Sequence, residues 1–337
     1  MGKEIRLNEL AEKLNISTTT VSRALSGNGR VSEETRKKVI EAAREMDYSS
    51  PSQNRQKNTT PSIGKSGNVG VVLSRDLLYE SDFFHHCLLG AAGALADHGY
   101  ETLLILCNTD EYEPLIPAVE KGALDGVIYT RAITGEKSHS YLKKKNIPVV
   151  VVGSGIKNAV MVEPNTALAC RELTSSLMNN GCKRIAYIGG NMNYNVNVKR
   201  LEGVMMGISD FCVDPDPNLI FRDVSNYNSC KIAVETAVQR RCDGIICCDD
   251  VTAGWSCDAL TKMGLSVPSD VLLAACYDSS DLAHHSPSIT AAHFDARQMG
   301  AYAGEAMYGL LTGTEKRTLI TVEHTIHLRE STRVFTF

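Results

Sequence analysis

The feature that most constrains the fold of this chain is a series of short apolar runs separated by segments of helix length. The runs occupy residues 68–73, 101–106, 125–130 and 148–153, and then 184–190, 218–223, 243–250 and 270–278. Runs that are apolar throughout are typical of parallel strands buried on both faces in βαβ units. The phrases ALDGVIYT and RCDGIICC, 118 residues apart from Asp125 to Asp243, echo each other. We therefore predict a doubly wound α/β body of two similar lobes, with a ligand site between them at the carboxyl ends of the strands.

A different pattern precedes this body. The spacing of apolar residues predicts three short helices, with a break at Asn15-Ile16, a second helix started by Ser17 and a third capped by Ser32. Residues 49–67 are rich in Ser, Thr, Asn, Gln and Pro, as linkers are. The predicted organisation is a head (1–48), a linker or hinge (49–67) and a body (68–337), whose lobes span roughly 68–155 and 165–285 with C-terminal crossover segments.

The head has the arrangement of a helix-turn-helix, whose second helix enters the major groove of DNA with its N-terminal residues at the base edges. Thr18 and Thr19 stand at this position, and each offers a hydroxyl and a methyl group for base contacts. Ser17, Thr20 and Ser22 are placed for phosphate contacts, and Arg23 for a guanine edge or a phosphate. The alternative from pattern alone is a capped helical hairpin that contacts another protein.

Charge and composition narrow the function classes. Residues 1–60 carry a net charge of +3 within a chain whose total is −4, so a basic head precedes an acidic body. The eleven cysteines lack a C-x-x-C pair, which favours buried free thiols over metal or redox chemistry. The nine histidines show no partner at ligand spacing, so no metal or cofactor is predicted. Without a signal peptide or a long apolar stretch, we expect a cytoplasmic protein with no membrane contact.

The head resembles that of the LacI/GalR family of transcription regulators over Ile16 to Leu25 and Val31 to Arg36, within LAEKLNISTTTVSRALSGNGRVSEETRKKV. Ser26 replaces the family's usual Asn, and Arg6 stands where a capping Ser or Thr is usual. The resemblance implies a homodimer on a pseudopalindromic operator, with a hinge helix that wedges Leu side chains into the minor groove. An ungapped alignment places Arg55 on the hinge Arg but Lys57 on the wedging Leu, so Lys57 is expected to contact a phosphate.

The body resembles the type I periplasmic-binding-protein fold of the same family, through the phrases RIAYIGG, CYDSSDLAHHSPSIT and HLREST. The resemblance implies an effector, expected to be a sugar, held by four residues: Phe84, Arg200, Asp249 and Asp278. An Arg fork and carboxylates suit the adjacent hydroxyls of a polyol. Alternative roles are core packing for Phe84, a surface ion pair for Arg200 and a helix N-cap for Asp249. The first lobe departs from the family at GSG (153–155) and EPN (163–165).

The function that these patterns favour is a transcription regulator, expected to be a repressor, whose DNA affinity a small molecule controls. The alternative is a sugar-binding protein or an enzyme built on the same fold. The sequence has no P-loop, no G-x-S-x-G and no H-E-x-x-H. It also pairs a DNA-binding head with no export signal, which is the reverse of a transport protein. No catalytic residue is predicted.

Overall fold

The structure, a computed structural model of the chain, describes residues 11–26, 32, 35, 37–39, 41–42, 66–74, 82–107, 113–130, 137–153, 156 and 159–333. The chain forms two compact units, Met1–Ser62 and Ile63–Phe337, and each is considered by itself. Among the described residues, no helix is long and apolar enough to cross a membrane.

The first unit contains the helix α2 (Thr18–Ser26). Helical residues 11–13 precede it, and Asn15 ends that turn in the left-handed region at φ 51°. The N–H of Ile16 donates to the carbonyl of Ala11 at 3.1 Å, which is how such a helix end satisfies its last carbonyls. Five apolar side chains form the buried interior that is described: Ala11, Val21, Ala24, Val39 and Ala42. The predicted break at Asn15-Ile16 is confirmed.

The second unit is the body, and it contains two sheets of six strands each. Sheet A, in spatial order, consists of β11 (Leu319–Val322), β5 (Val160–Pro164), β4 (Val149–Val152), β3 (Gly126–Tyr129), β1 (Asn68–Ser74) and β2 (Glu101–Cys107). Sheet B consists of β12 (Thr325–His327), β10 (Thr290–His293), β9 (Leu272–Ala275), β8 (Gly244–Cys247), β6 (Ile185–Ile188) and β7 (Ile220–Phe221). All neighbours are parallel except β10 and β12, which are antiparallel.

Helices cover both faces of each sheet. Around sheet A lie α5 (Asp82–Asp97), the 3-10 helix η2 (Glu113–Leu115), α6 (Ile116–Glu120), α7 (Lys137–Lys144) and α13 (Ala296–Thr312). Around sheet B lie α8 (Thr166–Asn179), α9 (Asn195–Ser209), η3 (Pro217–Leu219), α10 (Tyr227–Gln239), α11 (Asp250–Lys262), α12 (Ser280–His284) and η4 (Glu330–Thr332). Alternate strand residues enter opposite cores: Val150 packs with α5 and α13, whereas Val149 and Val151 pack with α6 and α7.

Two pairs of helices approach closely because glycine faces backbone. In the pair α5 and α13, a methyl group on Gly90 would overlap the carbonyl of Arg297, and one on Gly300 would overlap the carbonyl of Cys87. In the pair α8 and α9, a methyl group on Gly203 would overlap the carbonyl of Ala167. Each lobe therefore has one helix pair whose separation depends on the absence of a side chain.

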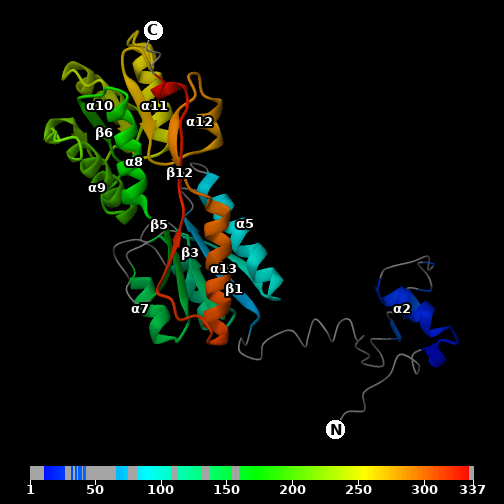
Figure 1. The fold of residues 1–337 in the computed structure, drawn as a ribbon. Helices are drawn as coiled ribbons and strands as arrows, with labels where there is room; N and C mark the ends of the chain where they lie inside the picture. The colour runs from blue at the N-terminus through cyan, green and yellow to red at the C-terminus, as the bar shows by residue number, and fades with distance from the viewer. Residues whose placement is uncertain are drawn as a thin grey trace. The chain divides into compact units, whose positions relative to one another are not determined.

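The chain crosses between the lobes three times (Figure 1). It passes from β5 into α8, from β10 into α13, and from β11 into β12. The first crossing leaves the carboxyl end of a sheet A strand, and the second leaves the carboxyl end of a sheet B strand. The carboxyl edges of the two parallel sheets therefore face each other at the junction of the lobes, where α/β proteins bind ligands.

All eight predicted strands are present and parallel, so the doubly wound two-lobed body is confirmed. Four strands were not predicted, namely β5, β10, β11 and β12, which flank the crossings. The eleven cysteines are free thiols, and all but Cys212 are buried, as expected for small apolar side chains.

Candidate functional site

The helix α2 presents its first turn to solvent. The Ser17 hydroxyl accepts the backbone N–H of Thr20 at 3.1 Å and lies 2.8 Å from the Thr20 hydroxyl, so the predicted N-cap is confirmed. Ser32 caps the following helical segment in the same way, accepting the N–H of Thr35 at 3.2 Å. The cap is satisfied by Ser17 and Thr20, and Thr18 and Thr19 are exposed.

The other predicted DNA-contacting residues fall into two groups. Arg23 is exposed on α2, while Val21 on the opposite side is fully buried. Arg55, Lys57 and the side chain of Ser22 lie outside what the structure describes. The linker prediction, apart from Ser66 and Gly67, also lies outside the described residues. The contacts assigned to these positions stay predictions.

In the body, Arg200 on α9 reaches the carboxyl edge of sheet B. Its Nη1 donates to the Oδ1 of buried Asn197 at 3.1 Å, and its charge lies within electrostatic reach of Asp249. Its Nε is buried, and no acceptor among the described residues lies within hydrogen-bond distance of it. A buried donor left without an acceptor costs about 1–3 kcal/mol, which a bound ligand can recover.

Asp249 is the N-cap of α11. Its Oδ1 accepts the N–H of Thr252 at 2.9 Å and the Thr252 hydroxyl at 2.7 Å, while that hydroxyl lies 3.2 Å from the Asp249 N–H. Asp249 therefore caps α11, which is the alternative role considered for it, and the cap hydrogen bonds are made to its Oδ1. Next to it, burial and the negative charge of Asp249 raise the pKa of the Asp250 carboxyl to about 6.

Asp278, which follows β9, is buried and already paired. Arg329 donates to both of its carboxylate oxygens, at 2.7 Å to Oδ1 and 2.8 Å to Oδ2. The Nδ1 of His327 lies 2.8 Å from Oδ2, and the Nδ1 of His293 lies 3.5 Å from it. Burial alone would raise the pKa of Asp278, but the hydrogen bonds from Arg329 and His327 outweigh burial and lower it.

This cluster around Asp278 was not anticipated from the sequence. The histidines and Arg329 are 15 to 51 residues away from Asp278, too far apart to show ligand spacing. An effector that binds Asp278 must share the carboxylate with Arg329 or displace it. The predicted convergence of Arg200 and Asp278 on one ligand stays a prediction, since Arg200 donates to Asn197 whereas Asp278 is bound to Arg329 and His327.

The aromatic position predicted for the effector lies beside the junction. Phe84 on α5 is buried in the core shared by α5, α13 and sheet A. Its neighbour Phe83 is half-buried and packs edge-to-face on Tyr277 of the second lobe, with ring centres 5.6 Å apart. Phe83 therefore packs across the junction, and Phe84 lies in the same core cluster as Tyr277.

Polar contacts also join the lobes. Lys199 on α9 forms an ion pair of 2.9 Å with Glu163 on β5, and the Glu163 side chain is only 14% exposed. The hydroxyl of Ser280 donates to Asp82 at 3.1 Å, beside the Phe83–Tyr277 contact. The glutamate belongs to the EPN segment that departs from the family pattern, and here it takes part in a contact between lobes instead of facing solvent.

Two family models match the chain. The model described as "Bacterial regulatory proteins, lacI family" matches residues 6–51, and the one described as "Periplasmic binding protein-like domain" matches residues 174–332. The chain is 25% identical to the HTH-type transcriptional regulator RegA of Clostridium saccharobutylicum, with 97% of this chain and 98% of RegA covered. It is also 25% identical to the HTH-type transcriptional repressor PurR of Pasteurella multocida, again with 97% and 98% covered.

Solved structures of similar proteins have the same fold. The transcriptional regulator CelR in complex with cellobiose superposes with a TM-score of 0.75 at 23% identity, covering 97% of this chain and 99% of CelR. The lac repressor dimer bound to operator and the anti-inducer ONPF superposes with a TM-score of 0.72 at 19% identity, covering 98% and 100%. At these identities the structures establish the architecture of head and body. They do not establish which ligand the side chains at the junction of this chain bind.

Proposed function

The chain belongs to the LacI family of bacterial regulatory proteins, and from that premise we propose that it represses transcription as an operator-bound homodimer controlled by a carbohydrate effector. It is a transcriptional regulator and not an enzyme. The relatives that it matches along nearly its whole length are also transcriptional regulators. The finer proposal covers the repressor role, the effector class and the dimer. Because its DNA target lies there, we also infer that the protein works in the cytoplasm.

The first turn of α2 supports a division of labour in DNA binding. Thr18 and Thr19 are exposed and specify bases, whereas Ser17 and Thr20 pair with each other and position the helix. Replacing Thr18 with Ala should change the preferred base by roughly 1–3 kcal/mol at one position of each half-site. Replacing Thr20 with Ala, the matched control, should weaken binding to all sequences alike. Selection of operators from random DNA with each variant measures both effects, and unchanged base preference in Thr18→Ala contradicts the assignment.

A single short recognition helix covers too few base pairs for useful specificity, which supports a dimer on two half-sites. Sedimentation of the full chain should therefore show a dimer, and a full operator should bind far more tightly than a half-site. A monomer that binds one half-site as tightly as the full operator contradicts the proposal.

Lys57→Ala should lower the slope of the plot of log DNA-binding constant against log salt concentration by about one unit, as the loss of one phosphate contact does.

The observation that most supports a ligand between the lobes is the buried Nε of Arg200 at the carboxyl edge of sheet B, which has no hydrogen-bond partner within the described part of the chain. A guanidinium with one free N–H and a nearby Asp249 suits adjacent hydroxyls, which donate to the carboxylate and accept from Arg200. CelR, whose structure holds cellobiose, shares this fold. A carbohydrate is therefore the effector class that we propose, with Arg200, Asp249 and Asp278 as candidate contacts and Phe84 in the core behind them.

Arg200→Ala should abolish the response to effector and leave operator binding without effector intact. A ligand shifts DNA affinity only through its differential affinity for the two lobe arrangements, which in typical systems is about 1–3 kcal/mol. Fluorescence anisotropy of labelled operator, titrated with each member of a panel of mono- and disaccharides, measures this shift. A full response in Arg200→Ala, or loss of DNA binding without any ligand, means that Arg200 is not the effector contact.

A further inference from the structure

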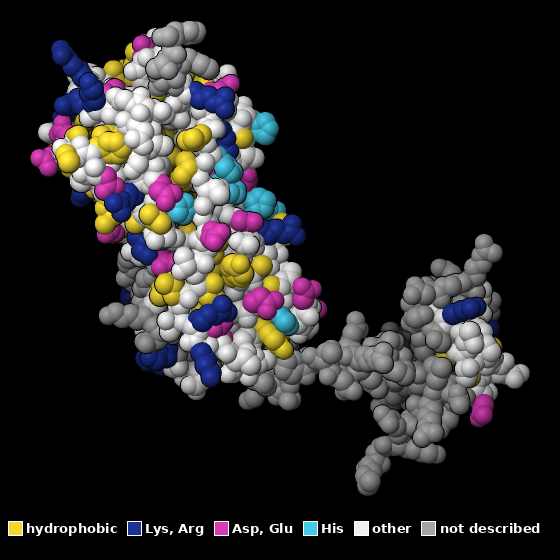
Figure 2. Space-filling view, in the orientation of Figure 1, with side chains coloured by type: hydrophobic (Ala, Val, Ile, Leu, Met, Phe, Trp, Pro, Cys, Tyr) yellow, Lys and Arg dark blue, Asp and Glu magenta, His cyan; other side chains and the backbone are white. Residues whose placement is uncertain are grey.

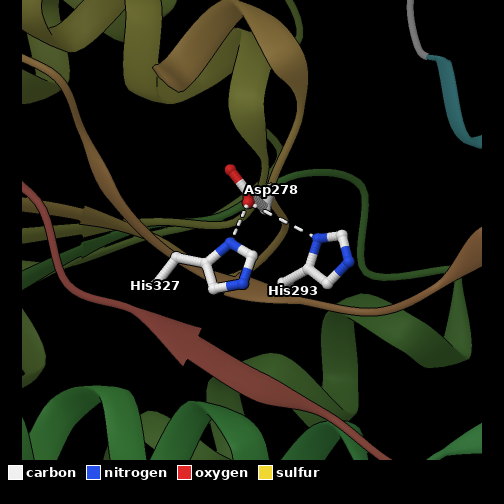
Figure 3. A group of neighbouring side chains, drawn as sticks. All are labelled: Asp278, His293 and His327. Carbon is white, nitrogen blue, oxygen red and sulfur yellow. Dashed lines mark hydrogen bonds and ion pairs between the residues drawn. The ribbon is translucent and has the colours of Figure 1, made fainter.

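Three side chains outside the Arg200 region direct potential metal-ligand atoms at one point. Asp278 follows β9, His293 ends β10 and His327 ends β12, and one ligand atom from each lies within 4.8 Å of the others. Figure 3 shows both imidazoles with Nδ1 toward the same carboxylate oxygen of Asp278. The two rings are stacked, with centres 4.6 Å apart and planes 16° from parallel, so they present their nitrogens side by side.

Outer contacts hold these groups in orientations that suit a metal. The Nε2 of His327 lies 3.3 Å from the Thr325 hydroxyl. Without an ion, Nδ1 donates its proton to Asp278, and once an ion displaces that proton the ring can keep an N–H on Nε2 and donate it to Thr325. Histidines that bind metals usually donate their other N–H in this way, and ligating carboxylates are themselves hydrogen-bonded. Arg329 supplies the latter contact through its Nη1 bond of 2.7 Å to Oδ1.

We propose that Asp278, His293 and His327 bind a divalent transition-metal ion of the Zn²⁺, Co²⁺ or Ni²⁺ class. Two imidazole nitrogens and one carboxylate oxygen are the donors that such ions prefer, and three protein ligands leave at least one position for water or another oxygen. The ion takes Oδ2, and Arg329 keeps Oδ1. Any proton on either Nδ1 passes to solvent as the metal–nitrogen bond forms, so no oxidant or reductant is involved.

The positive charge of Arg329 opposes the binding of a cation. Arg329 is already neutralised by Asp278, to which it is bonded through both nitrogens. Figure 2 also shows histidine side chains gathered where α12, β12 and α5 approach each other on this face of the body. The exposed His85, His86 and His284, and the half-buried His285, could hold metal nonspecifically, so the test must separate them from the proposed site.

The position of the site gives the ion a structural consequence. His293 is the last residue of its strand before the chain crosses into α13, and His327 lies in the strand entered after the chain crosses back from β11. An ion bound to both, and to Asp278, ties two crossings to the end of β9. Metal binding should therefore stabilise the body in the absence of DNA and effector. Asp278 is also a candidate effector contact, so the two proposals share this residue, but the metal titration uses neither DNA nor sugar and its failure is distinguishable from failure of the proposed function.

The experiment uses the full chain without a histidine tag, stripped with a chelator and titrated with Co²⁺ at about pH 7.5, where imidazole is mostly neutral. We expect one ion per chain, with visible d–d absorption bands, displacement by Zn²⁺ and a rise in unfolding temperature. His293→Gln and His327→Gln should each weaken binding roughly tenfold or more, and the double variant should abolish the bands. Both substitutions lie at half-exposed positions, and circular dichroism reports whether each variant folds.

Two matched controls keep the result decisive. His324→Gln removes an imidazole from the same crossing segment whose Nε2 pairs with Glu172 at 3.0 Å, and it should leave binding unchanged. Replacing His85, His86, His284 and His285 together with Gln should also leave it unchanged. The proposal is overturned if the wild-type chain binds neither ion, if the His293/His327 double variant keeps the Co²⁺ bands, or if the surface variant loses them.

Discussion

Asp250, in the first turn of α11, is a carboxyl group whose burial and proximity to Asp249 make its contribution to stability depend on pH. Its pKa is raised to about 6 in the folded protein, against about 3.9 in an unfolded chain. Between these values the folded state retains a proton that the unfolded state has lost, so the free energy of unfolding falls as pH rises through this window. Above it, the full cost of a charged Asp250 is present.

Asp250→Asn should therefore raise the free energy of unfolding above pH 6, by roughly 1–2 kcal/mol after allowance for partial exposure. Below about pH 4 the variant and the wild type should be equally stable. Urea unfolding at several pH values measures the difference, and Asp258→Asn, on the exposed face of the same helix, is the matched control. A constant difference between Asp250→Asn and wild type at all pH values would show that Asp250 does not titrate as described.

At the residue scale, the sequence predicts interactions between near neighbours, such as helix caps, but not ion pairs between residues that are distant along the chain. The caps by Ser17 and Ser32 depend on a residue three positions away, so the sequence contains them. The pairing of Asp278 with Arg329 depends on where β9 and η4 lie in space, which no local pattern encodes. Asp249 combines both cases. Its N-cap bond joins residues three positions apart and is visible in the sequence, whereas a contact with an effector depends on the folded arrangement.

At the scale of elements, the echo between ALDGVIYT and RCDGIICC has a structural explanation. Asp125 accepts the backbone N–H groups of Ser66 at 3.0 Å and Gly67 at 2.8 Å, where the chain enters β1. Asp243 accepts those of Lys183 and Arg184, at 2.9 and 2.8 Å, where the chain enters β6. Each aspartate fastens the first strand of its lobe to the neighbouring strand, so the repeated phrase reports repeated topology and not a ligand site.

The strands that were missed differ physically from those that were predicted. Strands such as β3 and β8 are buried throughout and form continuous apolar runs. By contrast, β11 alternates exposed and buried residues, and β12, with the sequence TIH, has three residues, none of them buried. The edge strands β11 and β12 are short and partly exposed, so they lack the continuous buried run by which the other strands were predicted, although they complete both sheets.

The close pairing of α5 with α13 predicts opposite effects for two glycines. Gly300→Ala should destabilise the body by about 1–3 kcal/mol or more, because the new methyl group meets the Cys87 carbonyl and the helices must separate. Gly93→Ala, on the exposed face of α5 with nothing within 4 Å of the new atom, should be neutral or stabilise by up to about 1 kcal/mol. Thermal unfolding compares the two variants, and equal losses of stability would contradict this account of the helix pair.

At the scale of the whole body, the described residues include several contacts between side chains of the two lobes. The Phe83–Tyr277 ring contact and the Ser280–Asp82 hydrogen bond lie on one side of the junction, and the ion pair of Lys199 with Glu163 joins α9 to β5. Contacts of this kind contribute about 1 kcal/mol each, which is the scale of a ligand-controlled equilibrium. The lobe arrangement is thus poised to respond to a modest binding energy.

Phe83→Ala should shift this equilibrium by about 0.5–1.5 kcal/mol away from the arrangement described here. Small-angle X-ray scattering of the ligand-free protein should then give a larger radius of gyration, with little change in the unfolding of either lobe. Tyr308→Ala is the matched control, because Tyr308 stacks on His98 within the first lobe, with ring centres 3.7 Å apart. The prediction fails if Tyr308→Ala expands the body as much as Phe83→Ala does.

The three crossings between the lobes also determine when the body can fold as it leaves the ribosome. Sheet A lacks β11 and one covering helix until residues 296–322 have been translated. Sheet B lacks β12 and Ser331, whose hydroxyl donates to the Leu273 carbonyl at 2.6 Å and accepts the Thr290 N–H at 2.8 Å. During most of synthesis, therefore, the nascent chain carries two unfinished sheets with open edges. Such edges pair readily with other strands, so this protein should depend on chaperones until residues 319–331 have left the ribosome.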